Sequence, residues 1–242
     1  NYDLEKFMDT SDEWIKKRTG IKFRHFVEDN ELTSDMGTNA AELAIFNAGL
    51  KPKDIDLIIL ATTTPDNTFP STASKIQRNL GCKAISFDVQ AVCAGFIFAL
   101  SSANAQIISG QANRILVIGS ETFSNLMDWS DRATCVLFGD GAGAVLLTAS
   151  NKDTGLKTAF MSCVPDTREC LHLPSWGLSP LHFTNDIFVS LNFEGQEVFK
   201  NAVKGMSDAI DNVLSKEDIQ VADIDLFIPH QANMRIIQSL AK

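Results

Sequence analysis

The chain has 242 residues, of which 45% are hydrophobic and 21% charged, a balance typical of a globular protein rather than a disordered or collagen-like one. Its 21 basic and 30 acidic residues give a net charge of −9, which argues against nucleic acid as a partner because the phosphate backbone would be repelled. The five cysteines are odd in number and unevenly spaced, and no apolar run reaches the length of a membrane span, so we expect reduced thiols in a cytoplasmic protein without a membrane segment.

Apolar runs rich in β-branched residues alternate with helical patterns, which predicts an α/β fold. Most of the predicted strands are apolar on both faces, as expected for strands covered by helices on both sides. Strands are predicted at residues 56–62, 84–89, 114–120, 143–148 and 225–229. Helices are predicted at residues 35–48, 71–80 and 93–109, and each is followed by a glycine suited to ending a helix.

One sequence pattern occurs twice. Residues 53–59 (KDIDLII) follow an amphipathic helix, and residues 222–228 (ADIDLFI) follow another, 169 positions later. The shared helix, acidic turn and strand favour two related halves packed together, with chance similarity of a short pattern as the alternative. Residues 151–193 are weaker in periodicity and hold Pro165, Pro174 and Pro180, so we expect an irregular connection that contributes a binding loop.

Cys93 stands in the run FDVQAVCAGFIFAL, where a predicted buried strand leads into an apolar helix. A thiol in the first turn of a helix lies near the positive end of the peptide dipoles, which lowers its pKa, and the same N–H groups can bind an oxyanion. These are the properties of a nucleophile. The alternative is a small buried hydrophobic side chain, the usual state of a free cysteine.

His230 follows a predicted strand and precedes a predicted helix in the run DLFIPHQAN. The ends of strands in open α/β sheets border the ligand crevice, so His230 is a second candidate for catalysis. The other histidines lack such a position and are expected to be solvated or hydrogen-bonded, namely His25, His172 and His182. Together with Cys163 and Cys170, the later histidines match no common zinc spacing, and no metal site is predicted.

A short basic helix is predicted near the start of the chain, in the run TSDEWIKKRTG. Thr10 and Glu13 fit a capping box at its beginning, and Gly20 fits its end. Trp14 and Arg18 are four residues apart and therefore share one face, which suits stacking of a flat base beside a phosphate. The alternative is an amphipathic helix with Trp14 packed inward.

The glycine-rich run at residues 139–143 (GDGAG) resembles a phosphate loop only superficially. It precedes a predicted strand rather than a helix, and its spacing is neither G-x-G-x-x-G nor Walker A. A nucleotide-binding fold is therefore rejected, and the small residues are expected to allow close backbone approach.

Several motifs follow one another along essentially the whole chain: DEWIKKRTGI, ATTTPDNTFPST, FDVQAVCAGF, DRATCVLFGDGAGAVLL, EGQEVFK and PHQANMRII. This series resembles bacterial β-ketoacyl-acyl-carrier-protein synthase III, a thiolase-fold condensing enzyme. The resemblance implies a duplicated, layered α-β-α-β-α architecture, which accounts for the repeated pattern. Residues 1–150 would form the N-terminal thiolase-like half with the nucleophile, and residues 151–242 the connection and a truncated C-terminal half with His230.

The activity implied by the resemblance is the initiation of type II fatty-acid biosynthesis. An acyl-CoA, usually acetyl-CoA, condenses with malonyl-acyl-carrier protein to give acetoacetyl-acyl-carrier protein, CoA and carbon dioxide. In this comparison Cys93 would be the acylated nucleophile, and His230 would promote decarboxylation of the malonyl group. No metal or organic cofactor is implied, since coenzyme A enters as a thioester substrate.

The resemblance also implies binding residues and partners. Trp14 and Arg132 would enclose the adenine of CoA, with Arg18 on its phosphates and Asn233 near the pantetheine arm. Phe69 would be lent across a homodimer interface to the acyl pocket of the neighbouring subunit. A basic surface for the acidic carrier protein would include Arg235, Lys200 and Lys242.

Two further interpretations stay open. The family carries a third catalytic residue, an Asn in a Gly-Asn-Thr-Ser motif downstream of PHQAN, and this sequence ends at Lys242 before such a motif. One alternative is a related Cys–His acyltransferase of secondary metabolism that acts on other acyl groups. The other is an inactive fragment that binds CoA or a full-length partner.

Overall fold

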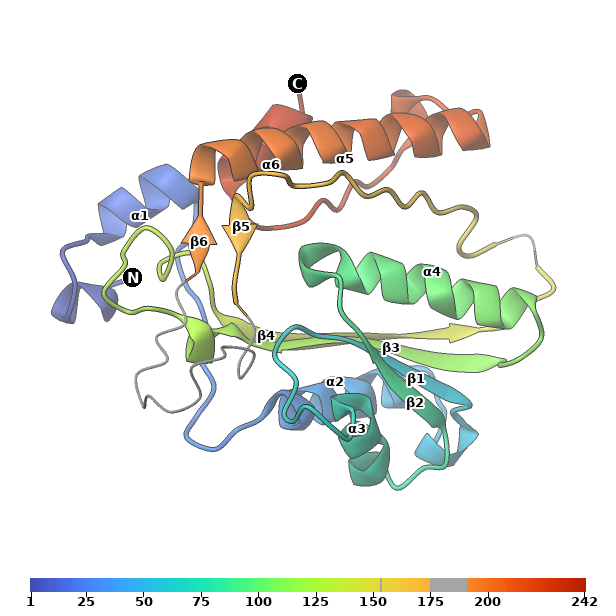
Figure 1. Cartoon of the computed structure of the whole chain (residues 1–242). Coiled ribbons are helices and arrows are strands. Elements are labelled where there is room, and N and C mark those ends of the chain that lie inside the picture. Colours follow the sequence, from blue (N-terminus) through green and yellow to red (C-terminus); the bar gives the residue numbers. More distant parts are fainter. Residues whose placement is uncertain (153, 175–190) are drawn as a thin grey trace. The chain divides into compact units, whose positions relative to one another are not determined.

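The computed structural model describes residues 1–152, 154–174 and 191–242 (Figure 1). The chain divides into two compact units, which we name by their content. The sheet unit holds His25–Phe123 and Gly139–Ala159, and the helical unit holds Asn1–Arg24, Ser124–Phe138 and Phe160–Lys242. These units group residues by their contacts within this chain, and the two halves expected at residues 1–150 and 151–242 stay a prediction.

The sheet unit is built on four strands in the order β2-β1-β3-β4. β1 is parallel to both β2 and β3, whereas β4 is antiparallel to β3, with Thr122 opposite Asp140. The four strands predicted between residues 56 and 148 are confirmed, with small shifts at their ends. They are β1 (Leu57–Ala61), β2 (Ile85–Val89), β3 (Arg114–Thr122) and β4 (Asp140–Thr148).

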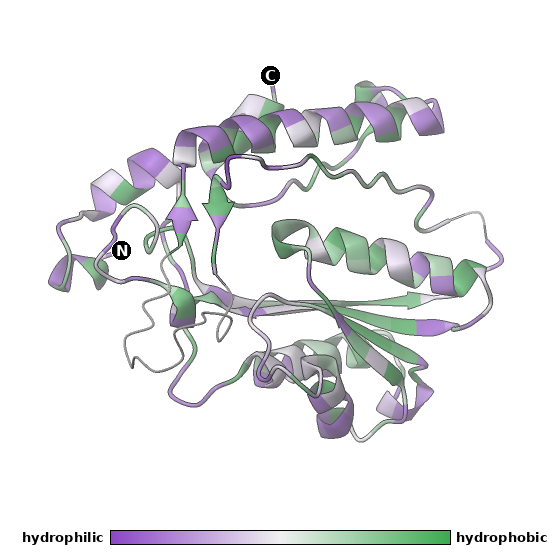
Figure 2. Cartoon of the chain, in the orientation of Figure 1, coloured by the Kyte–Doolittle hydropathy of each residue, from purple (hydrophilic) through white to green (hydrophobic). Residues whose placement is uncertain are grey.

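Helices cover both faces of this sheet. α2 (Thr33–Asn47) and α3 (Thr72–Leu80) lie on one face, and α4 (Gly95–Ile108) lies on the other (Figure 1). Alternate residues of the central strands enter the two cores: Ile58 and Leu116 face α2 and α3, and Ile59 and Val117 face α4. The middle residues of the central strands are therefore hydrophobic, as Figure 2 shows, because neither face meets water there.

The helical unit contains α1 (Asp12–Thr19), α5 (Gly195–Glu217), α6 (Met234–Leu240) and a pair of two-residue antiparallel strands, β5 (Leu171–His172) and β6 (Asn192–Phe193). The predicted capping residue of α1 is wrong: Ser11, not Thr10, accepts a hydrogen bond from the backbone N–H of Trp14 at 3.1 Å. The predicted end is confirmed, since Gly20 has a φ of 80°. No helix in the described part of the chain is long and apolar enough to cross a membrane.

Short 3₁₀ helices connect the larger elements, namely η1 (Leu4–Lys6), η2 (Pro52–Asp54), η3 (Val92–Ala94), η4 (Phe123–Leu126) and η5 (Val221–Asp223). The repeated sequence pattern is also a repeated local structure. After α2, the Asp54 carboxylate accepts from the backbone N–H of Lys51 at 2.9 Å, and after α5 the Asp223 carboxylate accepts from that of Gln220 at 2.8 Å. In both places the carboxylate therefore caps the start of the short 3₁₀ helix to which it belongs.

The residues after the two turns differ. Those after η2 form β1, whereas the strand predicted at residues 225–229 is absent. A strand needs a partner for its backbone hydrogen bonds, and these residues have no paired strand in the described part of the chain. Leu226 and Ile228, predicted to be buried, are accordingly 74% and 76% exposed.

Candidate active site

Cys93 lies at the carboxyl edge of the parallel strands of the sheet unit. It is part of η3, between the end of β2 and the start of α4, and the residue is exposed. The preceding Val92 has a φ of 47°, which is a strained conformation for a β-branched residue and typical of turns that carry function. The predicted position between strand and helix is confirmed, and the left-handed turn is an addition that the sequence pattern did not indicate.

The start of α4 packs closely against the end of β1. A Cβ atom added at Gly95 would meet the Cβ of Ala61 at 3.3 Å, so a glycine permits this close approach. Ala61 is paired with Val89 of β2 and with Gly119 of β3. The turn that carries Cys93 is therefore anchored at the end of the middle strand.

The pKa of the Cys93 thiol is raised above its ordinary value, and the prediction of a lowered pKa is wrong. Burial of the sulfur among protein atoms is the largest cause, although the residue as a whole is exposed. The Glu121 carboxylate raises the pKa further, and the backbone N–H of Cys93 lowers it. The dipole of a helix stabilises a negative charge at its N-terminus by about 1 kcal/mol or less in most proteins. This stabilisation of the thiolate is too small to outweigh the cost of desolvating it. The thiol is thus held protonated near neutral pH.

Glu121, near the end of β3, binds the loop that follows β1. Its Oε1 accepts a hydrogen bond from the backbone N–H of Thr63 at 2.7 Å. Its Oε2 accepts from the hydroxyls of Thr63 and Thr64 at 3.0 and 2.7 Å. Desolvation nevertheless raises the pKa of the carboxyl group, against the lowering effect of these hydrogen bonds. Sequence reasoning missed Glu121, although a lone acidic residue at the end of the apolar run RILVIGSE was a usable signal.

Threonine side chains complete this edge of the sheet. The Thr64 hydroxyl accepts from the backbone N–H of Thr122 at 2.9 Å, and the Thr33 hydroxyl donates to the Thr64 carbonyl at 2.6 Å. Thr62 accepts from the backbone N–H of Thr64 at 3.1 Å, and its own N–H donates to the carbonyl of Val89 at 3.2 Å. The loop beside Cys93 is therefore fixed to β2, β3 and α2 by buried polar contacts.

Phe69 lies in the segment between β1 and α3. It is 83% exposed, which is unusual for a phenylalanine. Its suggested place at a homodimer interface stays a prediction.

An aromatic and basic cluster lies in the helical unit. The guanidinium carbon of Arg18 is 4.6 Å from the centroid of the Trp14 ring, and that of Arg132 is 5.3 Å from the same centroid. The predicted common face of Trp14 and Arg18 is confirmed. Arg132 is held by Asp9, whose carbonyl and carboxylate both accept from its Nη1, the carboxylate at 2.8 Å. Both cations therefore lie against one indole.

His230 lies in the extended segment that precedes α6, in the helical unit. The residue is exposed, yet partial burial of its imidazole lowers its pKa below the ordinary value. The imidazole is thus neutral at physiological pH and keeps one N–H donor.

The beginning of α6 lies against the end of α1. Asn233 caps α6, because its side-chain oxygen accepts from the backbone N–H of Arg235 at 2.9 Å. A Cβ atom added at Gly20 would lie 2.7 Å from the Cβ of Met234, so the two helix ends are in close contact. The structure thus brings Asn233 and Arg235 to the helix that bears Trp14 and Arg18.

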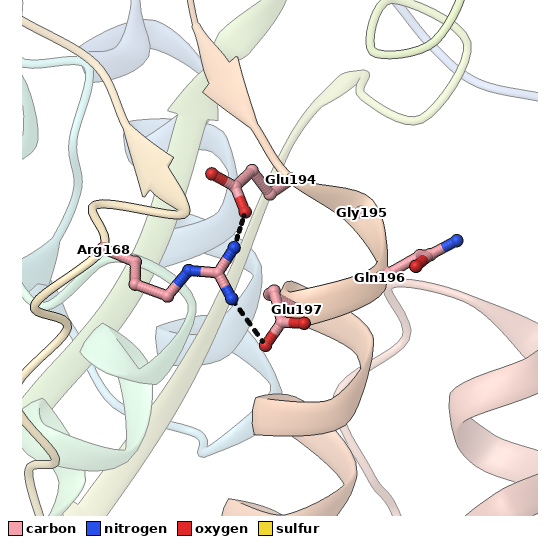
Figure 3. Close-up of a pocket in the computed structure, with 5 residues that line it drawn as sticks. All are labelled: Arg168, Glu194, Gly195, Gln196 and Glu197. Carbon is pink, nitrogen blue, oxygen red and sulfur yellow. Dashed lines mark hydrogen bonds and ion pairs between the residues drawn. The ribbon is translucent and has the colours of Figure 1, made fainter.

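The three basic residues predicted for carrier docking are all exposed in the helical unit. Arg235 belongs to α6, Lys200 to α5, and Lys242 is the last residue. Lys200 forms an ion pair with Glu197 at 2.9 Å. The same Glu197 and Glu194 flank Arg168 in a small pocket at the start of α5 (Figure 3), at 3.6 and 2.9 Å from the guanidinium nitrogens. The charge of Arg168 is therefore neutralised locally.

The described residues contain no group of three or more His, Cys, Asp or Glu side chains arranged to hold a metal ion. His182, one of the histidines weighed as a zinc ligand, lies outside the described residues.

Comparisons with known proteins agree on one family. The family model for 3-oxoacyl-[acyl-carrier-protein (ACP)] synthase III matches residues 87–163, which include Cys93. The β-ketoacyl-[acyl-carrier-protein] synthase III of Ehrlichia canis is 49% identical over 244 residues, covering all of this chain and 75% of the relative. That of Brucella anthropi is 49% identical over 248 residues with the same coverage.

Solved structures give the same result. The 3-oxoacyl-[acyl-carrier-protein] synthase III of Aquifex aeolicus superposes with a TM-score of 0.91 at 45% identity, covering 100% of this chain and 74% of that one. The priming β-ketosynthase of the R1128 polyketide pathway superposes with a TM-score of 0.87 at 32% identity, covering 100% and 72%. The predicted thiolase-like α/β fold is thereby confirmed. The chain belongs to the β-ketoacyl-[acyl-carrier-protein] synthase III family of condensing enzymes.

Proposed function

We propose that the chain catalyses the decarboxylative condensation of an acyl-CoA, in the first instance acetyl-CoA, with malonyl-acyl-carrier protein. The observation that carries this proposal is the strained turn that presents Cys93 at the carboxyl edge of the sheet. The reaction would start type II fatty-acid synthesis, in keeping with the family.

In the loading step, the sulfur of Cys93 attacks the thioester carbonyl of acyl-CoA. The carbon–sulfur bond to CoA breaks, and CoA leaves as a thiol after taking up the proton that Cys93 gives up. The raised pKa of Cys93 means that this proton is still present when the substrate arrives. The backbone N–H of Cys93 is a candidate donor to the oxyanion that forms on the thioester oxygen.

In the condensation step, malonyl-acyl-carrier protein loses carbon dioxide, and the electron pair of the broken bond forms an enolate. The imidazole of His230 would donate a hydrogen bond to the enolate oxygen, a role that needs a neutral ring with one N–H. The lowered pKa of His230 supports this role, since it keeps the ring neutral. The carbanion then attacks the acyl-cysteine, and the Cys93 thiolate leaves.

The CoA end of the substrate would bind at α1. The adenine would lie between Trp14 and Arg132, with Arg18 on the phosphates and Asn233 near the pantetheine arm. The cation–π contacts of both arginines with Trp14 support this assignment, because the same surfaces stack a purine.

The malonyl-acyl-carrier protein would dock on exposed basic residues. Arg235, Lys200 and Lys242 fit an acidic partner by charge, and Arg235 lies on the helix capped by Asn233, close to the proposed CoA site. No metal or organic cofactor takes part in this scheme. The enzyme would act in the cytoplasm as a homodimer, with Phe69 inserted into the neighbouring subunit.

A second candidate is a Cys–His acyltransferase that primes secondary metabolism, which the 32% identity to the R1128 priming β-ketosynthase favours. An assay with malonyl-acyl-carrier protein and a panel of acyl-CoA thioesters separates the two. The proposal predicts acetoacetyl-acyl-carrier protein and carbon dioxide, with acetyl-CoA preferred over longer chains. Preference for a longer or branched acyl-CoA would favour the second candidate, and absence of any condensation product would contradict both.

A further inference from the structure

Among the described residues that the proposed reaction does not use, Glu121 carries a partly buried carboxylate that interacts with Cys93. It occupies the third position after Ile118 in β3, and Ile118 pairs with Leu60 of β1. Thr62 to Thr64 continue β1, and Cys93 follows β2 on its other side. Because the three strands are parallel, these groups meet at one edge of the sheet.

We propose that Glu121 is a positioning residue of the acyl-accepting site, which fixes the loop beside Cys93 through Thr63 and Thr64 and places a negative charge near the thiol. The role in fixing the loop rests on the three hydrogen bonds to the Glu121 carboxylate, at 2.7, 3.0 and 2.7 Å. The threonine contacts then connect this loop to Val89, four residues before Cys93.

The other acidic residues at this edge are bound to α3, whereas Glu121 is bound to the loop beside Cys93. Asp66 pairs with Lys75 of α3 at 2.6 Å, and Asp88 accepts from the backbone N–H groups of Thr72 and Ala73 at the start of α3. These charges are used elsewhere.

In the described part of the sheet unit, acidic side chains of two other elements bind other groups. Asp140 of β4 accepts from the backbone N–H of Val27 at 2.9 Å, and Asp35 of α2 accepts from that of Leu32 at 2.9 Å. The sequence of α4, GFIFALSSANAQII, has no ionisable side chain. Among the described groups, the carboxylate of Glu121 is accordingly the charge that acts on Cys93.

The charge has a chemical consequence for the free enzyme. It opposes formation of a thiolate, which protects the nucleophile from alkylation and oxidation while no substrate is bound. After the acyl group has been transferred, the sulfur is a neutral thioester and the repulsion disappears. Glu121 therefore favours the acylated enzyme over the free thiolate.

The test is the rate at which iodoacetamide alkylates Cys93, measured by peptide mass spectrometry between pH 6.5 and 9.5. Glu121→Gln keeps the size of the side chain and an oxygen acceptor but removes the charge. We expect the pH midpoint of alkylation to fall by about one unit, equivalent to roughly tenfold faster alkylation at pH 8. The exposed Cys163 in the same sample serves as an internal reference, with the same rate in both proteins.

Asp88→Asn is the matched control, since it neutralises a carboxylate at the same edge that is bound to α3, and it should leave the rate at Cys93 unchanged. An unchanged rate in Glu121→Gln, or an equal increase in both variants, would overturn the proposal. If Glu121→Gln does not fold, the wild-type protein can still overturn the proposal, because a native midpoint at or below that of the same cysteine in urea-unfolded protein would contradict it. The proposal rests on the role proposed for Cys93 as the acyl acceptor. Alkylation measures the reactivity of the thiol and needs no acyl transfer, so a failure of the Glu121 proposal can be distinguished from a failure of the proposed function.

Discussion

The guanidinium of Arg132 lies only 5.3 Å from the centroid of the Trp14 ring. A purine stacked between them needs two layers of van der Waals contact, roughly 7 Å between the outer groups. In this structure Arg132 and Trp14, the proposed adenine clamp, are thus too close together for an adenine to fit between them, and Asp9 holds Arg132 in place. Binding of CoA would separate the two side chains and exchange one stacking partner for another.

Trp14→Ala should weaken the use of acetyl-CoA by removing this stacking surface. We expect the KM for acetyl-CoA to rise roughly tenfold with little change in kcat, since a stacked base contributes about 1–3 kcal/mol. Acetyl-pantetheine, which lacks the adenine, is the control substrate, and its kinetics should be the same in the variant and the wild type. Equal losses with both thioesters would contradict the clamp.

Gly20→Ala should disturb the contact between α1 and α6. Alanine at this position is strained by the φ of 80° and its Cβ would lie 2.7 Å from that of Met234. Gly110→Ala is the matched control, because Gly110 has a φ of 72° but no atom within 4 Å of the added Cβ. Urea unfolding should show a loss of about 1 kcal/mol for the control and at least about 1 kcal/mol more for Gly20→Ala. Equal losses would contradict the close approach of Gly20 and Met234.

His230→Ala should separate the two half-reactions. Acyl loading of Cys93 is expected to continue, whereas decarboxylation of malonyl-acyl-carrier protein should fall about 100-fold or more. Single-turnover loading and release of labelled carbon dioxide measure the two steps. A similar loss in both would count against the proposed role.

The pH dependence of decarboxylation provides a second test of His230. Its lowered pKa keeps the imidazole neutral as the pH falls through about 6.5, where an ordinary histidine becomes charged. The rate in the wild-type enzyme should therefore stay constant through this pH and decline only below it. An acid limb centred above pH 6.5 would show that a different group is titrating.

Arg235→Glu should reduce the use of malonyl-acyl-carrier protein while leaving loading from acetyl-CoA nearly intact. Charge reversal at a docking surface acts mainly on association, so we expect a higher KM for the carrier protein that becomes less marked at high salt. Lys53→Glu, on the exposed turn η2 of the sheet unit, is the surface control. An unchanged KM for malonyl-acyl-carrier protein in Arg235→Glu would show that Arg235 does not belong to the docking surface.

The sequence predicted the sheet unit well, because its signals are local. The runs LIILA of β1 and ILVI of β3 are apolar on both faces, and Gly81 and Gly110 end helices with φ values of 65° and 72°. The prediction of a strand at residues 225–229 was wrong because strand formation there depends on a contact that is not local. The hydrophobic pattern is sound, but strand formation depends on a partner that the pattern cannot supply.

The candidate site could be predicted only in part. The position of Cys93 between a strand and a helix follows from periodicity, and the proximity of Trp14 and Arg18 follows from their helical spacing. The position of His230 was predicted only on its helical side, since the strand expected before it is absent. The contacts of Arg132 with Trp14 and of Glu121 with Thr63 join segments far apart in sequence, so no local pattern reveals them. The direction of the Cys93 pKa shift was mispredicted, because burial and the carboxylate of Glu121, which is far away in the sequence, outweigh the helix dipole.

The most direct test of the account is a peptide map of the protein after incubation with acetyl-CoA. We predict an acetyl group on the peptide that contains Cys93, lost in Cys93→Ser and on treatment with hydroxylamine, which cleaves thioesters. Label on the buried Cys82 or Cys135, or no acetylated cysteine in the folded protein, would contradict the proposal that Cys93 accepts the acyl chain.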